Sequence, residues 1–542
     1  MKAIDGYDKL RGGYYTPTEI TDFIINWAIR KTDELILEPS CGDGSFLDSI
    51  KKHSQKVLTC SDQVIGIELD PKEAEKASRY GYKVINNDFF TYYLENIEGK
   101  QNFDIIVGNP PFIRYQNFDE KYRIIAFDLM AKHGFHPNRL TNIWLPFLIL
   151  SCEALKPDGR LGMVIPAELF QVDYASEARN YLSSHFDQLT LVTFKRLVFS
   201  SIQQEVVLLL GEKKSGKKGI SVVELEGLND LNELWHSRFE HAETKELDHN
   251  SDKWVKYYLT NEELQLLREL NLDPRISNAN DLYEVNVGLV SGENDFFISD
   301  WKNVVNRGIQ NEMKPIISRS EQVKGIILSE EEYQSLRKQE KRVSIFMPGD
   351  LPVEQLSYCA QNYIKWGENN GYNKNYKCRI RKRWYVVPSS WGADAFLIRQ
   401  ANLYPKMILN PEGILVTDTL HKVRFHSGIK GKAVASAFLN TYTFALSETL
   451  GRSYGGGVLT FEPGEMRRLR IPMKGAENLD IERIDIFQRE GAYEDILEYT
   501  DRVLLYEGLG LSKYEVNLLH SIWNKLRERR MSRKKRHQRV LK

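Results

Sequence analysis

The stretch Phe103-Asp104-Ile105-Ile106-Val107-Gly108-Asn109-Pro110-Pro111-Phe112 joins an apolar run to a stiff, polar turn. The run 103–108 is short and almost continuously apolar, which is the pattern of a buried strand in a parallel sheet. Residues 109–112 should therefore lie at the carboxyl end of that strand, where open α/β sheets bind their ligands. Two consecutive prolines stiffen the turn and remove two backbone donors, so that carbonyl oxygens remain as acceptors. Asn and Pro are also ordinary turn residues, and a plain strand-to-loop connection is the competing interpretation.

The chain around this stretch alternates strand and helix patterns, as parallel α/β sheets do. The last two strands expected in this part leave no room for a helix between them, so they should form an antiparallel hairpin at one edge. The prediction is an α/β fold with a seven-stranded, mostly parallel, Rossmann-like sheet, and a run at 220–225 is a candidate further strand. We expect strands at 34–38, 63–68, 82–87, 103–108, 160–165, 189–194 and 204–210, and helices near 17–30, 45–53, 71–79, 141–155 and 174–185.

The pattern changes twice along the chain, which predicts three domains. Residues 1–245 form the α/β domain, and an acidic, helix-prone stretch that ends near residue 250 is typical of a linker. Residues 255–475 contain short strands and many turn signals, which favours a mixed α+β domain. Helical periodicity returns in 480–542, a segment that ends in a basic tail.

The composition is that of a soluble globular protein, with 42% hydrophobic and 27% charged residues among 542. No apolar segment approaches the roughly 20 residues that a membrane span needs, and the first residues lack the apolar core of a secretion signal. Five cysteines are scattered without the spacing of a metal site, which favours a reducing cytoplasm and predicts no structural metal. They are Cys41, Cys60, Cys152, Cys359 and Cys378.

Charge is distributed unevenly, although the formal net charge is zero. Residues 1–250 contain 29 Lys and Arg against 37 Asp and Glu, whereas 251–542 contain 45 against 37. Within the second part, 365–432 holds 13 basic and 4 acidic residues, with aromatic residues interleaved between 371 and 385. Basic residues with interleaved aromatic rings fit contacts to nucleic-acid phosphates and bases. A solvated, charged surface is the alternative.

The loop Glu38–Phe46 follows the first expected strand and opens a helix. Its glycines let the backbone pass close to a ligand, but it has neither the GxGxxG pattern nor the Lys of a phosphate-binding loop. A neutral or cationic adenosine-type ligand therefore suits it better than a nucleoside triphosphate. The second strand ends at Glu68, at the distance where an acidic residue commonly accepts the ribose hydroxyls. The third ends before Asp88 and Phe89, a carboxylate and a ring that suit adenine; each acidic residue taken singly also fits a strand-end cap.

Taken in order, these motifs resemble those of amino-methylating DNA methyltransferases. The resemblance covers residues 10–210 motif by motif, from Gly13-Tyr14-Tyr15-Thr16-Pro17 through the Glu38–Phe46 loop to Asn109–Phe112. An N-terminal tyrosine-threonine-proline motif, then the cofactor loop, then the Asn-Pro-Pro motif is the gamma order. The chain is similar to the adenine-N6 members of TaqI type. Beyond residue 210 the resemblance is looser, although 288–297 and 454–472 look like parts of the family's target-recognition domain.

The resemblance implies S-adenosylmethionine as the methyl donor, without a metal, and it assigns roles to particular residues. Cys41 and Phe112 are modest variants, because the family more often has a small residue and Tyr there. The implied cofactor-binding residues are Thr16, Glu38, Cys41, Gly42, Gly44, Glu68, Asp88, Phe89 and Asn109. The implied catalytic residues, which hold and stack the target base, are Asn109, Pro110, Pro111, Phe112 and Phe199.

The chemistry of an exocyclic amine explains why the Asn109–Phe112 turn would suit it as a binding site. Its lone pair is delocalised into the ring, and acceptors at Asn109 and Pro110 would hold both N–H hydrogens and free that pair. In duplex DNA the amine lies inside the stack, so the nucleotide has to be extruded and held between aromatic faces such as Phe112 and Phe199. The second domain would then contact duplex DNA. Its candidate DNA-binding residues are Arg379, Arg381, Lys382 and Arg383, although an alternating basic strand that faces solvent has the same sequence.

We expect a site-specific adenine-N6 DNA methyltransferase, the modification enzyme of a type II restriction-modification system. It should be a monomer in the cytoplasm, associated with the nucleoid, and its endonuclease should be encoded alongside without a stable complex. Cytosine-N4 methylation and methylation of an RNA or protein amine are the alternatives. A catalytically inactive DNA-binding subunit is opposed by the intact motifs. A fused nuclease is suggested only by residues 312–314, which have the ExK pattern of a nuclease site. A pattern of three residues occurs at a frequency close to chance.

Overall fold

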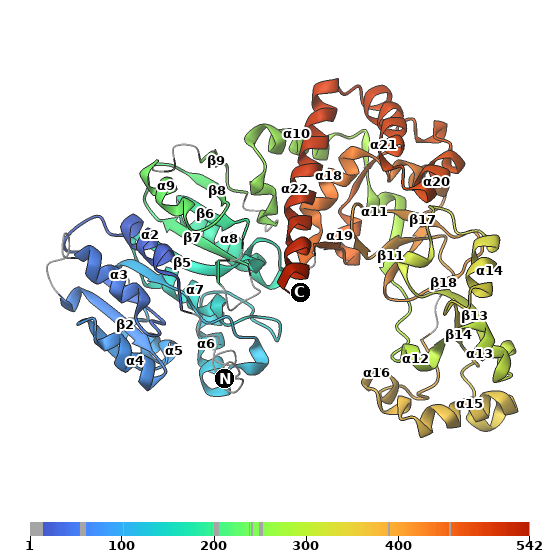
Figure 1. Ribbon diagram of the computed structural model, residues 1–542, viewed down its shortest axis with the longest axis horizontal. Coiled ribbons are helices and arrows are strands. Elements are labelled where there is room, and N and C mark those ends of the chain that lie inside the picture. The colour runs from blue at the N-terminus through green and yellow to red at the C-terminus, as the bar shows by residue number, and fades with distance from the viewer. Residues whose placement is uncertain are drawn as a thin grey trace. The chain divides into compact units, whose positions relative to one another are not determined.

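The computed structural model of the chain divides into two compact units, Met1–Leu264 and Gln265–Lys542 (Figure 1). No helix within the described ranges is both long and apolar enough to cross a membrane. The structure describes residues 15–54, 61–100, 102–196, 198–199, 205–237, 239, 242–248, 253–388, 391–454 and 457–540.

A single sheet organises the first unit. Strands β3, β2, β1, β4 and β5 run parallel to one another, and β7 is antiparallel to both of its neighbours, β5 and β6. Because the first five strands run the same way, their carboxyl ends lie along one edge. In sheet order the strands are β3 (Lys83–Asn86), β2 (Val64–Glu68), β1 (Ile36–Glu38), β4 (Phe103–Gly108), β5 (Leu155–Pro166), β7 (Val206–Glu212), β6 (Gln188–Phe194), β8 (Gly219–Leu225) and β9 (Thr244–Lys245).

Helices cover both faces of this sheet. One group packs over a large apolar cluster that includes Phe23, Phe46 and Val107. The other group includes α7, whose apolar sequence buries all but one of its side chains and which packs on β5. The first group is α2 (Thr18–Ala28), α3 (Ser45–Ser54), α4 (Pro71–Ser78) and α9 (Asp230–His236); the second is α5 (Phe89–Tyr92), α6 (Glu120–Lys132), α7 (Trp144–Ala154) and α8 (Ser176–His185).

The sheet differs from the prediction in its number of strands, which is nine rather than seven. The candidate strand at 220–225 is present as β8, which pairs in parallel with β6, and β9 adds one more antiparallel strand. The β6–β7 hairpin is therefore antiparallel, as expected, but it lies inside the sheet and not at its edge. Ile220 of β8 is fully buried, so the added strand extends the core beyond the hairpin.

The second unit is built from small sheets and helices. A four-stranded sheet contains β11 (Tyr283–Val287), β19 (Leu420–Phe425), β15 (Ala395–Ile398) and β17 (Met407–Leu409). A second contains β12 (Ile298–Ser299), β14 (Ser344–Phe346), β13 (Met313–Ile317) and β18 (Leu415–Val416). The remaining strands are β16 (Gln400–Ala401), β21 (Val458–Thr460), β20 (Arg452–Tyr454), β10 (Ile276–Asn278) and β22 (Arg470–Pro472). Its helices include α10 (Asn261–Leu272), which begins in the first unit, α11 (Ala279–Leu282), α12 (Asn294–Phe297), α13 (Trp301–Asn306), α14 (Glu330–Lys338), α15 (Tyr358–Asn369), α16 (Tyr376–Arg379), α17 (Gly431–Ala437), α18 (Thr441–Leu450), α19 (Pro463–Arg467), α20 (Ile481–Glu490), α21 (Tyr493–Asp501) and α22 (Lys513–Val540).

The C-terminal helices lie in the same compact unit as the preceding elements of the second unit. Helix α22 packs along α18, and its Arg530 donates to both carboxylate oxygens of Glu448 at 3.0 and 2.7 Å. Both side chains are almost fully buried. Breaking a buried pair of this kind leaves a desolvated charge and is strongly unfavourable, so residues 480–542 are held to the preceding domain.

Candidate cofactor and catalytic site

A cavity of about 380 Å³ lies at the carboxyl ends of the parallel strands. Glu38 ends β1, Glu68 ends β2, Asp88 follows β3 and Asn109 follows β4, and all four line the cavity. Residues that the sequence places in four separate motifs are thus brought together, because parallel strands end at one edge of a sheet.

The wall of this cavity is strongly acidic. Of the described residues that line it, seven are Asp or Glu and none is Lys or Arg. The acidic residues are Glu38, Asp43, Glu68, Asp70, Glu73, Asp88 and Asp119. Such a surface attracts a cation and repels phosphate groups, which agrees with the absence of a phosphate-binding sequence in the Glu38–Phe46 loop.

Glu38 is the most unusual of these carboxyl groups. It is only 2% exposed, and its Oε2 has no hydrogen-bond partner among the described residues. Burial, followed by the nearby charges of Glu68 and Asp43, raises the pKa of Glu38 well above its ordinary value. A buried carboxyl oxygen without a partner is costly, and a positively charged ligand in the cavity would relieve that cost.

Glu68 is oriented by backbone donors from two segments. The amide of Gly42 donates to Oε2 at 2.9 Å and that of Asp70 donates to Oε1 at 2.8 Å. Gly42 has a φ of +53°, a conformation that favours glycine, and a Cβ there would meet nothing within 4 Å. The loop therefore passes the cavity with open space beside it, and it fixes the carboxylate that faces the same space.

Asn109 and Thr16 join the turn after β4 to the segment before α2. The side-chain NH2 of Asn109 donates to Thr16 Oγ1 at 3.1 Å, and Ser40 Oγ donates to the Asn109 backbone carbonyl at 3.4 Å. The first bond places the Asn109 amide nitrogen at Thr16, so the amide oxygen faces the other way. Gly13 and Tyr14, which begin the Thr16 motif, lie outside the described residues.

Asp88 and Phe89 form the start of α5. Asp88 Oδ1 accepts a hydrogen bond from the Thr91 amide at 2.9 Å and so caps the helix. Burial raises the pKa of Asp88, and the hydrogen bonds from Thr91 oppose this rise. Phe89 is stacked on Phe147, with ring centroids 5.1 Å apart. Asp88 therefore both caps α5 and lines the cavity.

Gly44 and Cys41, two of the residues predicted to bind the cofactor, have other roles in the structure. Gly44 is not among the lining residues; a Cβ there would lie 2.7 Å from the Tyr80 ring, so its glycine is required by packing against α4 and the residues after it. Cys41 lines the cavity but is buried, and burial together with the Glu38 charge raises the pKa of its thiol. The thiol therefore stays protonated and is a poor nucleophile.

Only some of the residues predicted to hold the base line the cavity. Pro111 lines it, and Pro110 is not among the lining residues. Phe112 is half-buried against the apolar cluster of the first unit, whereas Phe199 is a member of that cluster and is 4% exposed. The flanking residues 197 and 200–202 of the Phe199 motif lie outside the described residues.

The basic run of the second unit is not the strand that an alternating pattern favours. It contains the short helix α16 followed by turns. Arg381 donates to the Val290 carbonyl at 2.9 Å, and Arg383 forms an ion pair with Asp350, so both are committed to contacts within the protein. Arg379 and Lys382 are exposed.

A basic and aromatic surface that sequence reasoning missed lies on β19. The Lys422 ammonium is 4.4 Å from the centroid of the Trp391 ring, and the Arg424 guanidinium carbon is 4.2 Å from it. Burial lowers the pKa of Lys422, and the adjacent Arg424 charge lowers it further. Spacing of two residues on a strand places both cations on one face, which was the available sequence signal.

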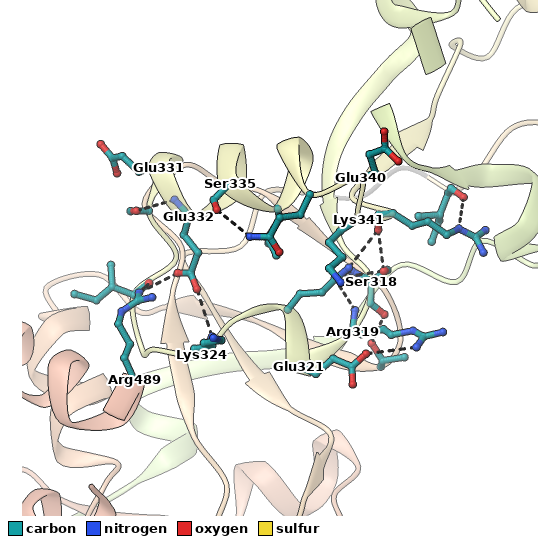
Figure 2. A pocket seen from close by; sticks show the side chains of 18 of the residues that line it. Ser318, Arg319, Glu321, Lys324, Glu331, Glu332, Ser335, Glu340, Lys341 and Arg489 are labelled. Atoms are coloured by element: carbon teal, nitrogen blue, oxygen red, sulfur yellow. Dashed lines mark hydrogen bonds and ion pairs between the residues drawn. The ribbon is translucent and has the colours of Figure 1, made fainter. Parts of the chain in front are cut away.

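A larger open cavity of about 1440 Å³ lies in the second unit (Figure 2). Some of its charged side chains are paired: Arg489 donates to Glu332 at 2.9 Å (Figure 2) and to Asp485 at 2.6 Å. Because opposite charges already neutralise each other there, we assign no ligand to it. Among the described residues, no group of three His, Cys, Asp or Glu side chains could hold a metal ion.

Comparison with known proteins gives consistent matches for both units. Residues 39–199 match the family model of the Eco57I restriction-modification methylase, and residues 251–505 match that of the C-terminal domain of the type II methyltransferase M.Eco57I. The type II methyltransferase M.AccI of Acinetobacter calcoaceticus is 24% identical over 477 residues, which cover 84% of this chain and 84% of that protein. The type II methyltransferase M.XamI of Xanthomonas campestris pv. amaranthicola is 23% identical over 497 residues, 86% of each chain.

One solved structure resembles both units. The type IIL restriction-modification enzyme MmeI, solved in complex with DNA, aligns with 94% of this chain and 75% of its own, with a TM-score of 0.56 and 11% identity. At that identity the likeness concerns the fold.

The buried Glu38 carboxyl group predicts a pH-dependent stability. The pKa of Glu38 is raised in the folded chain, so the protonated group stabilises the fold fully at pH values below 4.5, the ordinary carboxyl pKa. That stabilisation is lost as the pH rises through the pKa of Glu38 in the folded chain. Relative to wild type, Glu38→Gln should therefore gain unfolding free energy progressively as the pH rises above the ordinary carboxyl pKa of 4.5. Denaturant melts of the ligand-free proteins across that range measure the difference.

Glu95→Gln removes one carboxylate from an exposed position and controls for the loss of charge. Parallel pH profiles for wild type and Glu38→Gln would contradict the assignment of buried charge to Glu38.

Proposed function

We propose that this chain, which belongs to the S-adenosylmethionine-dependent methyltransferases of restriction-modification systems, methylates N6 of adenine in duplex DNA. One observation carries the proposal: the Asn109-Pro110-Pro111 turn borders an acidic, cation-attracting cavity at the carboxyl edge of the sheet. A methyl donor with positive charge and an amine acceptor would meet where the two adjoin.

The cavity residues fit this donor. S-adenosylmethionine supplies, when bound, a methyl group activated by a sulfonium charge. The unpartnered carboxyl group of Glu38 and the surrounding acidic wall would favour the cationic methionine end. Glu68, held by the Gly42 and Asp70 amides, would accept from ribose hydroxyls, and Asp88 and Phe89 would contact adenine.

The turn after β4 would bind the target amine. The amide oxygen of Asn109 and the carbonyl of Pro110 would each accept one N–H hydrogen, which favours a pyramidal nitrogen with a localised lone pair. Acceptors that are positioned before the reaction stabilise the positive charge that develops on the attacking nitrogen. Thr16, by holding the Asn109 amide nitrogen, would keep its oxygen directed at the amine.

Asn109 favours adenine over cytosine, because relatives that methylate cytosine N4 generally begin this tetrapeptide with Ser or Asp. The nucleotide would have to leave the duplex to reach the turn, and the half-buried Phe112 would stack on the base. Phe199 packs in the apolar cluster of the ligand-free chain and would reach a base only if that packing changed.

The second unit would supply contacts to DNA phosphates. The exposed Arg379 and Lys382 are free of the internal contacts that hold Arg381 and Arg383, and Lys422 with Arg424 adds a further basic surface. We further propose that the chain acts as a cytoplasmic, nucleoid-associated monomer. It would protect DNA from an endonuclease encoded alongside it, without a stable complex.

Removal of the Asn109 amide tests the catalytic assignment. Asn109→Ala should lower methyl transfer to DNA by at least ~10²–10³-fold, because a preorganised acceptor is lost. Binding of S-adenosylmethionine should remain largely intact, since most of the cavity wall is unchanged. Transfer of tritiated methyl groups to DNA measures the first quantity and calorimetry the second. A variant that transfers methyl groups at the wild-type rate would falsify the assignment, and transfer to tRNA or a release factor but not to DNA would favour the alternative substrates.

Salt dependence tests the phosphate contacts. Arg379→Ala combined with Lys382→Ala should reduce the slope of log binding constant against log salt by roughly 2, since each lost phosphate contact contributes about 0.9. The control Arg381→Ala combined with Arg383→Ala should change the slope less, because those cations are held by the protein. Equal slopes for wild type and the first variant would show that neither side chain contacts phosphate.

A further inference from the structure

A tight turn next to the Asn109–Phe112 motif carries an exposed leucine at its tip. Leu140 is 78% exposed, although the residues that follow it enter the core directly: Ile143 and Trp144 are fully buried. A leucine held in water on a fixed turn is unfavourable for the isolated chain. Exposed apolar groups beside a functional site are often the ones that a partner covers.

The turn is closed by its own hydrogen bonds. The Thr141 amide donates to the Asn138 carbonyl and the Asn138 amide donates to Thr141 Oγ1, both at 2.9 Å. The Leu140 amide donates to Asn138 Oδ1 at 2.8 Å. These three bonds fix the backbone on either side of Leu140, so its side chain is presented by a preformed turn.

A short backbone pairing ties this turn to the proposed base-binding motif. The Ile143 amide donates to the Ile113 carbonyl at 3.0 Å, and Arg114 forms an antiparallel bridge with Asn142. Ile113 follows Phe112 directly and lines the acidic cavity. Leu140 lies two residues before Asn142, the residue that forms this bridge. The turn that carries Leu140 and the proposed base-binding motif are thus held by one backbone pairing.

Cations flank the leucine. Arg114 and Arg139 are both exposed, and within the described part of the chain neither forms an ion pair. Exposed, unpaired arginines on either side of an apolar tip suit the negative backbone of DNA around an apolar base stack.

We propose that Leu140 inserts into the DNA base stack and occupies the space that the extruded adenine leaves, while Arg114 and Arg139 contact the adjacent phosphates. The proposal rests on the proposed function, because only an enzyme that extrudes its target base needs such a residue. Apolar wedges of this kind insert between base steps in proteins that distort DNA. Leu140 stabilises the extruded state without touching the amine, and it is therefore a positioning residue.

Insertion of Leu140 into the base stack predicts a result that a purely structural role of this leucine does not. Extrusion costs least for a mispaired base, so the wedge matters for a paired target and little for a mispaired one. Single-turnover methylation is measured on two duplexes that contain the recognition site, one with the target adenine paired to thymine and one with it mispaired. On the paired duplex, Leu140→Ala should be slower than wild type by about tenfold, equivalent to about 1.4 kcal/mol. On the mispaired duplex, the two proteins should agree within about twofold.

Two further variants complete the test. Leu140→Phe keeps an apolar wedge and should restore the rate on the paired duplex. Leu272→Ala removes a leucine that is 82% exposed elsewhere and should leave both rates unchanged. The wedge is overturned if Leu140→Ala methylates the paired duplex at the wild-type rate, or if it is slowed equally on both duplexes. Failure of the wild type on both duplexes would instead overturn the proposed function, and the wedge with it.

Discussion

The burial of a carboxyl group at the end of β1 is the constraint on which the site depends. Glu38 lies out of water, and the charges of Glu68 and Asp43 add to the cost of ionising it. Interactions within the first unit do not relieve that cost, since Oε2 of Glu38 has no partner among the described residues. The buried Glu38 carboxyl group therefore destabilises the ligand-free fold, and a cationic ligand bound beside it would restore that stability. Such a local loss of stability is common at binding sites.

Parallel strand ends bring the acidic cavity next to the turn that follows β4. Because β1 and β4 are neighbours, the Glu38–Phe46 loop and the Asn109–Phe112 turn adjoin, and the Ser40 hydroxyl bonds to the Asn109 carbonyl. The same turn continues into the pairing that supports Leu140. In the proposed function, donor binding, amine binding and base extrusion would use the loop after β1, the turn after β4 and the segment that pairs with that turn.

Apolar strands and the residues after them could be predicted from the sequence, because a buried strand needs a continuous apolar run and its loop follows directly. Other features depend on partners far along the chain. The internal contacts of Arg381 and Arg383 involve Val290 and Asp350, which no local pattern indicates. Helix α6 lacks a clear apolar face and was not expected. Gly44 lies in a loop whose sequence pattern indicates ligand binding, but in the structure it packs against the Tyr80 ring.

The most direct test is the identity of the methylated nucleoside. DNA methylated by the purified protein with S-adenosylmethionine is digested to nucleosides and analysed by mass spectrometry. The account predicts N6-methyladenine for wild type, because the two oxygen acceptors of the Asn109-Pro110 turn would face the amine of an extruded purine. N4-methylcytosine as the product, or a methyl group found only on RNA or protein, would contradict it.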